Sequence, residues 1–257
     1  MTTIDQPKGM PERLKPDSIK ILGVPVHLVT TAGAVELVSH FMDEPGLHQI
    51  ATVNPEFVMK AQEDSAFMAI LQQAELCIAD GVGLLIAGRW QGRPIPERVA
   101  GSDLVYLLAE QAALQGWRLF LLGAVPGVAE EAAGRLEELY TGLTIAGTYA
   151  GSPDPAENEE IVELINTSQA ELLYVAYGAP GQDKWIARNR QQLPTVRVAM
   201  GIGGSLDFIS GRAARAPSWL QRLGLEWLYR LFKEPRRWRR MLALPRFVFR
   251  IVREGSS

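Results

Sequence analysis

Short apolar runs rich in β-branched residues alternate with longer runs of helical spacing between Ser18 and Gly211. This alternation is typical of an α/β domain with a largely parallel sheet, because consecutive parallel strands are joined by a crossover that is usually a helix. The apolar runs predict eight strands, of which the first two form a small hairpin. They are Ile19–Leu22, Val26–Val29, Gln49–Val53, Leu76–Ala79, Arg118–Leu122, Leu143–Thr148, Glu171–Tyr177 and Val196–Met200.

Helical spacing of the apolar residues predicts helices between these strands. They are Ala32–Met42, Ser102–Gln115, Gly127–Tyr140, Ala156–Ile165 and Gln182–Gln191, and another helix begins near Val82. The chain has 257 residues, of which 47% are hydrophobic and 21% charged, so it can bury one large core or two small ones. This composition excludes disordered, collagen-like and coiled-coil chains.

Cysteine and histidine are too scarce for a disulfide framework or a structural zinc site. The sequence has one cysteine, Cys77, which is interpreted as a buried strand residue, and three histidines, His27, His40 and His48. A structural zinc ion needs four ligands, usually from a clustered set of Cys and His. The sequence therefore predicts neither feature.

The formal charge of −3 hides an uneven distribution along the chain. Residues Arg212–Ser257 hold eleven Arg and one Lys against three Glu, so this segment carries +9 and the remainder −12. Three of the six tryptophans, Trp219, Trp227 and Trp238, also lie in the basic segment. An acidic body with a basic end points to a polyanionic partner, either nucleic acid or an anionic membrane surface.

The sequence divides into three parts. Residues 1–17 contain Pro7, Pro11 and Pro16 among charged residues and lack the apolar core of a secretory signal, so we expect a disordered lead-in. Residues 18–211 form the α/β core. Residues 212–257 form a basic, amphipathic helical appendage at the C-terminus.

The appendage has the pattern of an amphipathic helix. One helical face carries Leu220, Leu223, Trp227, Leu228 and Leu231, and the opposite face carries Arg222, Glu226, Arg230 and Lys233. No run approaches the 18 or more apolar residues that a membrane-spanning helix needs. The pattern favours docking on a membrane surface, and the alternative is an ordinary pair of helices packed on the core.

Small residues follow the predicted strands at the points where they end. The segments are Thr52–Glu56, Asp80–Gly83, Gly123–Gly127, Tyr177–Lys184 and Gly201–Ser205. Because the carboxyl ends of parallel strands meet at one edge of a sheet, we expect one shared site there. Glycines such as Gly123 and Gly203 let backbone N–H groups approach an anion, and a following helix N-terminus adds its dipole. The sequence therefore predicts a phosphate-bearing ligand.

Common nucleotide-binding motifs are absent from these segments. Gly123 and Gly127 do not follow the G-x-G-x-x-G order, and the strand that ends near Thr148 offers no acidic residue for a ribose. A phosphate loop with Lys-Ser or Lys-Thr is also absent. No D-x-D triplet offers carboxylates to a metal-bound nucleotide sugar, so no metal ligand set is predicted.

Asp80 is the strongest catalytic candidate, because it directly follows the apolar run Leu76–Ala79. A carboxylate in this position can act as a general base toward a substrate hydroxyl, since partial burial raises its pKa toward the working range. The alternative role is an N-cap of the helix that begins near Val82, which position alone favours. Both roles can hold together.

Three further polar residues lie in loops near the expected site. Arg98 could clamp a diphosphate, although a solvated surface position is the more common alternative, and Ser102 or Asp103 could cap the helix that follows. Asn54 and Gln182 carry amides that could bind sugar hydroxyls. Their alternatives are a turn-forming role for Asn54 and a first-turn helix position for Gln182.

Six segments in a fixed order carry a resemblance to a known family. They are Thr52–Glu56, Ile78–Gly83, Arg98–Asp103, Leu121–Gly127, Tyr177–Trp185 and Gly201–Asp207. In this order they resemble the WecG/TagA/CpsF glycosyltransferases, family 26, and the resemblance extends over about Ile19–Arg250. Six ordered segments are far more specific than any one of them.

The resemblance implies an inverting glycosyltransferase with a Rossmann-like, largely parallel α/β core and flanking helices. Such enzymes move an N-acetylated amino sugar, typically N-acetylmannosamine or a relative, from a UDP-sugar donor. The acceptor is an undecaprenyl-diphosphate-linked sugar, and the product enters teichoic acid or another cell-surface polysaccharide. We expect no metal or other cofactor, so that Arg, Lys and backbone N–H groups must stabilise the charge that develops on UDP.

The resemblance also implies roles for individual residues. Asp80 becomes the catalytic base, and Thr52, Asn54, Arg98 and Gln182 become substrate-binding residues. Inversion needs one carboxylate to deprotonate the acceptor hydroxyl while that hydroxyl attacks the anomeric carbon opposite the leaving UDP.

The basic appendage gives the remaining expectations. Arg236, Arg237, Arg239 and Arg240 follow Pro235, and they either fold over the pocket as a phosphate clamp or face lipid. Because a polyprenyl-linked acceptor cannot leave the bilayer, we expect a cytoplasmic enzyme docked peripherally on the inner face of the membrane. A homo-oligomer is left open.

The alternative function is a nucleotide-responsive nucleic-acid-binding protein that uses the basic tail. The tail lacks a recognisable helix-turn-helix or RNA-binding motif, and its arginines are interleaved with large apolar residues. The sequence therefore favours the glycosyltransferase, with no nucleic acid among its partners.

Overall fold

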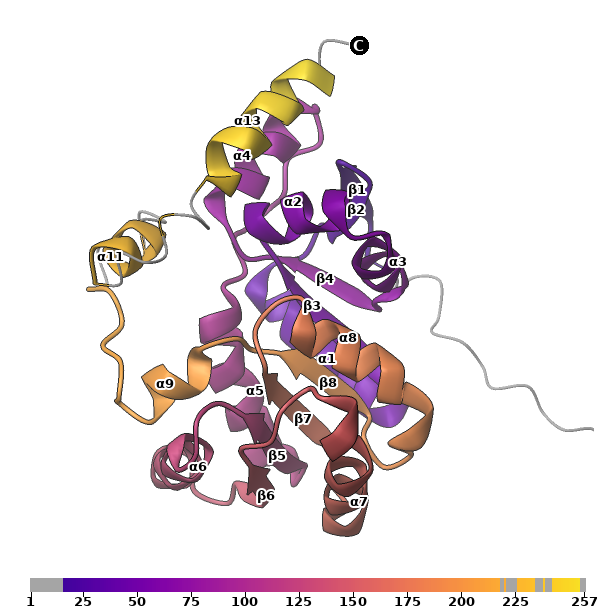
Figure 1. The fold of residues 1–257 in the computed structure, drawn as a ribbon, viewed down its shortest axis with the longest axis vertical. Coiled ribbons are helices and arrows are strands. Elements are labelled where there is room, and N and C mark those ends of the chain that lie inside the picture. The colour runs from indigo at the N-terminus through magenta and orange to yellow at the C-terminus, as the bar shows by residue number, and fades with distance from the viewer. Residues whose placement is uncertain (1–15, 218–219, 221–225, 234–237, 239–241, 255–257) are drawn as a thin grey trace, which may run out of the picture.

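The computed structural model describes residues 16–217, 220, 226–233, 238 and 242–254, and its centre is a six-stranded parallel sheet (Figure 1). The strands are β3 (His48–Val53), β4 (Leu76–Ala79), β5 (Arg118–Gly123), β6 (Thr144–Tyr149), β7 (Leu172–Ala176) and β8 (Val198–Gly201), in the spatial order β4-β3-β8-β7-β5-β6. Strands β1 (Ser18–Ile21) and β2 (Val24–His27) form a separate antiparallel hairpin. All eight predicted strands are confirmed, and their ends differ from the prediction by two residues at most.

The helices of the core alternate with these strands as predicted. They are α1 (Thr31–Asp43), α2 (Pro55–Glu63), α3 (Ser65–Gln73), α4 (Val82–Trp90), α5 (Gly101–Gln115), α6 (Val128–Leu139), α7 (Asn158–Ser168), α8 (Gly181–Asn189) and α9 (Ser205–Ile209). The C-terminal segment adds α11 (Glu226–Lys233) and α13 (Ala243–Glu254). The sequence had specified all the core helices except α2, α3 and α9.

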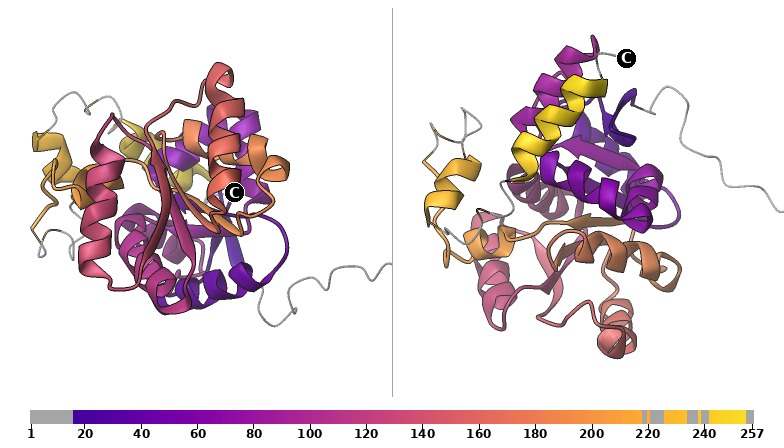
Figure 2. Two further views of the ribbon diagram at one scale, coloured as in Figure 1. Left: turned by 90° about the horizontal axis from the view of Figure 1, so that it is seen from below. Right: turned by 45° about the horizontal axis from the view of Figure 1, so that its top comes forward.

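Helices cover both faces of the sheet, which is why β3, β4 and β8 are buried along their whole length. Helices α1, α5 and α6 pack on one face. The hairpin with α2, α3 and α4 covers part of the other face, and α7 and α8 cover the rest (Figure 2). Cys77 lies within this core as expected, since its side chain is fully buried. The architecture is a Rossmann-like α/β sandwich of three layers.

The neighbouring strands β3 and β8 mark a topological switch point. After β3 the chain enters α2, whose Phe57 and Val58 join the hairpin side of the sheet. After β8 it enters α9, whose Leu206 and Ile209 join the opposite side. Because the connections after β3 and β8 leave toward opposite faces of the sheet, a crevice opens between the carboxyl ends of these strands.

The C-terminal segment is tied to the core at several points. Phe247 and Ile251 of α13 are buried in the cluster formed by the hairpin and α2, α3 and α4. One face of α13 therefore packs on the core, as expected from the alternative of helices packed on the core. In the described residues, no helix is both long and apolar enough to cross a membrane.

Two arginines at the start of the appendage also bind the core. Arg212 makes two hydrogen bonds to Glu131 of α6, at 2.7 and 2.8 Å. Arg215 donates to Ser102 Oγ at 3.0 Å and to Asp103 Oδ1 at 2.8 Å. The prediction that Ser102 or Asp103 caps α5 is wrong, because the N-cap position is Ala100 and both side chains are engaged by Arg215 instead.

Candidate active site

A pocket of about 300 Å³ lies at the switch point, at the carboxyl ends of β3, β4 and β8. Six of the predicted site residues line it. They are Thr52, Asn54, Asp80, Arg98, Gln182 and Gly203. These residues come from five separate segments of the chain, and the fold brings them together in the shared site that the sequence predicted.

The first turns of five helices contribute to the walls of this pocket. The lining includes Pro55 of α2, Val82 of α4, Gly101 of α5, Gln182 of α8 and Ser205 of α9. Each helix N-terminus presents backbone N–H groups without intrahelical partners and the positive end of a dipole. The arrangement therefore favours an anionic ligand such as a diphosphate.

Asp80 is half-buried and held by the backbone at the end of β4. Its N–H donates to the Val53 carbonyl at 2.7 Å, and the Val99 N–H donates to the Ala79 carbonyl at 3.0 Å. The N-cap position of α4 is Gly81 and not Asp80, which weakens the capping interpretation. The Asp80 carboxylate instead belongs to the pocket wall.

Thr52, Asp80 and the start of α5 are packed closely together. A Cβ atom added to Gly101 would lie 2.7 Å from Thr52 Cγ2 and 3.3 Å from Asp80 Oδ2. The Thr52 hydroxyl donates to the Gly201 carbonyl of β8 at 3.4 Å. Gly101 thus allows the N-terminus of α5 to approach the catalytic candidate, because any larger residue would collide with β3.

Asn54 combines a structural role with its place in the pocket. Its Oδ1 accepts a hydrogen bond from the Phe57 N–H at 3.0 Å, so Asn54 is the N-cap of α2 and Pro55 follows at the first helical position. Because the cap engages Oδ1, a contact with a sugar hydroxyl would use the Nδ2 group.

Gln182 shapes the glycine turn that follows β8. This side chain is 2% exposed, and its Oε1 accepts from the Gly203 N–H at 3.0 Å. A Cβ atom at Gly201 would lie only 2.3 Å from Gln182 Nε2, so the amide lies directly against the strand end. Gly203 itself has a φ of +54°, which glycine adopts at low cost.

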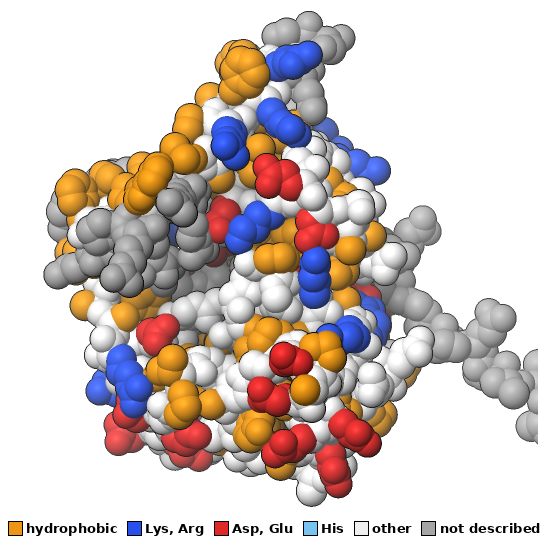
Figure 3. All heavy atoms as spheres, viewed as in Figure 1, with side chains coloured by type: hydrophobic (Ala, Val, Ile, Leu, Met, Phe, Trp, Pro, Cys, Tyr) orange, Lys and Arg blue, Asp and Glu red, His pale blue; other side chains and the backbone are white. Residues whose placement is uncertain are grey.

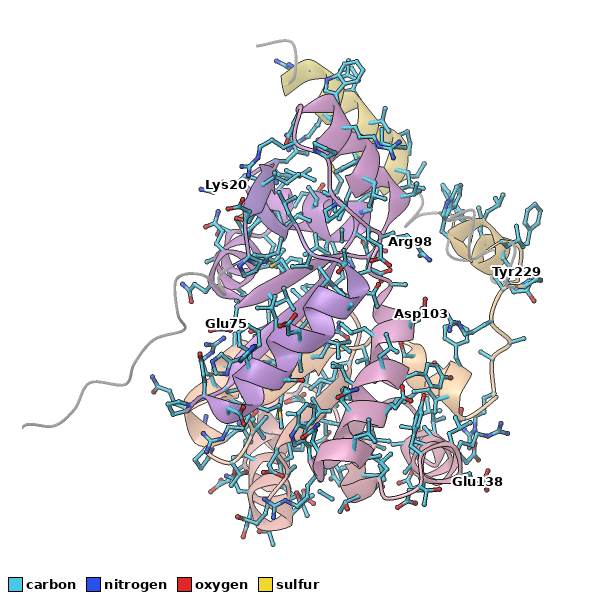
Figure 4. The ribbon with its side chains drawn as sticks, turned by 180° about the vertical axis from the view of Figure 1, so that it is seen from behind. Lys20, Glu75, Arg98, Asp103, Glu138 and Tyr229 are labelled. Carbon is cyan, nitrogen blue, oxygen red and sulfur yellow. The ribbon has the colours of Figure 1, made fainter. Side chains whose placement is uncertain are left out.

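Arg98 is half-buried and lines the pocket from the loop before α5. Arg98 and Asp103 project on the side of the core where α11 lies (Figure 4). Trp227 of α11 and Leu244 of α13 reach the same pocket, so the appendage contributes to its rim. A guanidinium in this position can bind phosphate oxygens with two hydrogen bonds.

Asp183 is a buried carboxyl next in sequence to the pocket residue Gln182. Burial raises its pKa to about 7, and the nearby amides of Gln49 and Gln182 oppose this effect without making well-formed hydrogen bonds to its oxygens. The side chain is fully buried. Asp183 was not predicted as a site residue, because nothing in its local sequence pattern distinguishes it from a solvated helix residue.

Five of the predicted site residues are not placed in the pocket. Gly123 ends β5 with a φ of +101° and lies against the Ala176 backbone, outside the pocket lining. Its role as a phosphate-binding glycine stays a prediction. Arg236, Arg237, Arg239 and Arg240 lie outside the described residues, so the phosphate clamp stays a prediction too.

The structure adds pocket residues that the sequence analysis did not assign. Glu56 lies in the wall and pairs with Lys60 at 3.0 Å, and Lys60 also donates to the Ala179 carbonyl at 2.8 Å. The ion pair lies within α2, and the hydrogen bond from Lys60 links α2 to the loop after β7. The position of Glu56 after a predicted strand could have indicated its place in the pocket. The place of Trp227 at the pocket depends on tertiary structure, and no local sequence signal predicts it.

Potential metal ligands do not gather in the part of the chain that the structure describes. No group of three His, Cys, Asp or Glu side chains there is close enough to hold an ion. The expected independence from a divalent metal stays a prediction to be tested by activity.

Three relatives align with most of the chain, and each is named N-acetylglucosaminyldiphosphoundecaprenol N-acetyl-β-D-mannosaminyltransferase. The Bacillus spizizenii (strain W23) enzyme is 34% identical over 88% of this chain and 87% of its own length. The Bacillus subtilis (strain 168) enzyme is 33% identical over 86% and 85%, respectively. The Staphylococcus aureus (strain MRSA252) enzyme is 31% identical over 94% and 95%.

A family model gives the same result over a longer range. The model of the glycosyl transferase WecG/TagA/CpsF family matches residues 19–257. Neither comparison supports the alternative of a nucleic-acid-binding protein. The pocket, the ordered segments and both comparisons agree, and the chain belongs to the WecG/TagA/CpsF family of glycosyltransferases.

Proposed function

We propose that this glycosyltransferase moves an N-acetylmannosamine-type sugar from UDP to an undecaprenyl-diphosphate-linked sugar, with inversion at the anomeric carbon. The observation that carries the proposal is that Thr52, Asn54, Asp80, Arg98 and Gln182 line one pocket at the switch point. The names of the three relatives support the same acceptor class and transferred sugar.

Asp80 is the general base of the proposed reaction. Its carboxylate takes the proton of the acceptor hydroxyl while the hydroxyl oxygen forms a bond to the anomeric carbon. The bond from that carbon to UDP breaks on the opposite face, and UDP leaves with the bonding electrons. The Arg98 guanidinium and the helix N-termini stabilise the negative charge that develops on UDP, so no metal ion is needed.

The other pocket residues position the substrates in this proposal. Thr52 and Asn54 lie beside Asp80 at the ends of neighbouring strands and provide hydroxyl and amide groups for the sugar. Gln182 acts through Gly203, because its side-chain oxygen holds the glycine turn in place. The phosphate groups would then bind against the N–H groups of that turn.

We also propose that residues 212–257 are an appendage that docks the enzyme peripherally on the inner face of the membrane. Phe232, Trp238 and Phe249 are exposed apolar side chains of this segment, and Arg246 and Arg250 are exposed nearby. An anionic membrane would attract these arginines. The proposed acceptor stays in the bilayer, so the enzyme must approach its surface.

The test of the proposed reaction is sugar transfer by the purified full-length chain in the presence of EDTA. The substrates are UDP-N-acetylmannosamine and a short-chain N-acetylglucosaminyl-diphosphate lipid, and mass spectrometry detects the product. We expect a disaccharide lipid and free UDP in equal amounts. Transfer that requires added magnesium would refute metal independence, and no transfer from any of a panel of UDP-sugars would refute the reaction itself.

A further inference from the structure

Exposed large apolar side chains are concentrated on one part of the molecule. Of fourteen such side chains among the described residues, ten belong to α4 or to the chain from residue 227 onward. The other four, Leu114, Val125, Leu139 and Leu164, lie singly on different elements. Isolated apolar residues are ordinary on protein surfaces, whereas a contiguous group marks a contact surface.

Helix α4 of the core carries three of these side chains in a row. Val82, Ile86 and Trp90 follow one another at intervals of four residues, so they share one helical face, and they are 38%, 60% and 57% exposed. Val82 lines the pocket. The apolar row therefore begins at the mouth of the pocket and continues outward along α4.

Helix α13 extends the same surface. Its Phe247 lies against α4, within 3.7 Å of the position that a Cβ of Gly83 would take, so the two helices are packed together. Val248, Phe249 and Val252 remain 57%, 68% and 44% exposed. We call Val82, Ile86, Trp90, Val248, Phe249 and Val252 the α4–α13 ridge.

Exposed arginines lie on both helices of the ridge and directly after α4. They are Arg89, Arg93, Arg246, Arg250 and Arg253. Helix α4 contains no acidic residue, and α13 contains only Glu254 at its end. Figure 3 shows hydrophobic side chains along the edge formed by α13 and α11, with basic side chains beside them. A few acidic side chains lie below α13, where Glu63 pairs with Arg246 at 4.0 Å, and most acidic side chains on this face lie toward the opposite end of the molecule.

We propose that the α4–α13 ridge enters the interfacial layer of an anionic membrane, so that helix α4 of the catalytic core, and not only the C-terminal appendage, contacts lipid. Apolar side chains fringed by arginines match acyl chains beneath anionic headgroups. A second copy of the chain is a poorer occupant, because a self-complementary contact would bring these arginines together. The inference rests on the proposed function, in that a pocket mouth held at the lipid surface suits a lipid-linked acceptor.

The test uses a fluorescent probe on α4 of the full-length chain. The natural cysteine Cys77 is fully buried and burial raises the pKa of its thiol, so it will not compete for a thiol-reactive dye. Ile86→Cys carries an environment-sensitive dye, and Leu114→Cys, at a position 70% exposed on α5, is the matched control. Both proteins are mixed with vesicles of phosphatidylcholine and phosphatidylglycerol.

We expect the dye at position 86 to shift to shorter wavelength on vesicle binding and to be quenched by spin-labelled lipid, while the dye at position 114 does neither. No shift at position 86, in protein that sediments with the vesicles, would show that the appendage docks alone and would overturn the proposal. An equal shift at both positions would show no preference for α4 and would overturn it too. A shift at position 86 that appears without vesicles as the protein concentration rises would indicate a contact between copies and would also overturn it.

A second pair of variants separates this proposal from the proposed function. The double variant Ile86→Ser, Trp90→Ser should weaken vesicle binding by roughly tenfold or more, because it removes the two large apolar side chains that are buried in the membrane on binding. Leu114→Ser with Leu139→Ser should leave vesicle binding unchanged. Neither pair lies in the pocket, so both should keep the wild-type kcat/KM with a soluble short-chain acceptor. If the wild-type chain fails to transfer sugar in that soluble assay, the proposed function is wrong, whereas the vesicle measurements still decide the role of α4.

Discussion

Arg98 lines the pocket beside the first turns of α4 and α5, where it can meet a diphosphate. Replacing Arg98 with Ala removes charge-assisted hydrogen bonds, each of which contributes about 1.5–3 kcal/mol. We therefore expect Arg98→Ala to weaken UDP binding by roughly 10- to 100-fold in a calorimetric titration. Arg89→Ala, an exposed arginine outside the pocket lining, is the control and should bind UDP like the wild type. Unchanged UDP affinity in Arg98→Ala would contradict a role in phosphate binding.

We expect Asp183 to make the stability of the protein depend on pH. Its pKa is about 7 in the folded chain, against an ordinary value of 3.8. Between these two values the unfolded chain has released the proton that the folded chain still holds, so stability falls as pH rises from about 4 to about 7. Three pKa units correspond to a loss of about 4 kcal/mol at most.

Replacing Asp183 with Asn removes this titration. The difference in unfolding free energy between Asp183→Asn and the wild type should therefore move in favour of the variant from pH 4 to pH 7 and stay constant above pH 8. Urea unfolding at a series of pH values measures it. A difference that is the same at pH 5 and pH 8 would show that Asp183 does not titrate in this range.

The sequence identified six residues of the pocket but not their local partners. Asp80 and Gln182 could be predicted because they follow buried strands, whose ends meet in a parallel sheet. The hydrogen bonds of Ser102 and Asp103 to Arg215 could not be predicted, since more than a hundred residues separate the partners. For Asn54, the sequence Asn-Pro-Glu was itself the signature of a helix start, and the turn interpretation missed it.

Helix α5 reaches β3 only because its first residue is a glycine. In Gly101→Ala the new methyl group would press on Thr52, a side chain of a buried strand that has no room to move. We expect a loss of about 1–3 kcal/mol in stability, together with lower transfer activity as Thr52 and Asp80 are displaced.

Gly134→Ala in α6 is the matched control, because nothing lies within 4 Å of an added Cβ there. That change should stabilise the protein by about 0.5–1 kcal/mol through helix propensity. Thermal unfolding and initial transfer rates measure both variants. Equal effects of the two substitutions would contradict the close packing of α5 on β3.

At the level of elements, the hydrophobic pattern was sufficient to predict all eight strands, because each is a short apolar run bounded by turn residues. Helices α2 and α3 are each nine residues long and are separated by Asp64, so neither gives a long periodic pattern. The order of the strands could not be predicted either. The placement of β8 beside β3 joins residues almost 150 positions apart, and this contact creates the pocket.

The whole molecule combines an acidic body with a basic, apolar end. Basic residues near an anionic surface each contribute about 1 kcal/mol, and salt screens that attraction. We therefore expect the full-length chain to sediment with phosphatidylglycerol vesicles at low salt, to be partly released at about 0.5 M salt, and to ignore vesicles of phosphatidylcholine alone. Binding that is equal for both lipids would contradict the electrostatic part of the docking.

The central claim is that the pocket at the switch point is the active site and that Asp80 is its base. Single-turnover transfer from UDP-N-acetylmannosamine to the short-chain acceptor, in EDTA, tests it with Asp80→Asn. The amide keeps the size of the carboxylate but cannot accept the proton, so the rate should fall by roughly 100-fold or more with an unchanged unfolding temperature. Asp43→Asn, at the exposed end of α1, should react like the wild type. An Asp80→Asn variant that transfers sugar at nearly the wild-type rate would contradict the account.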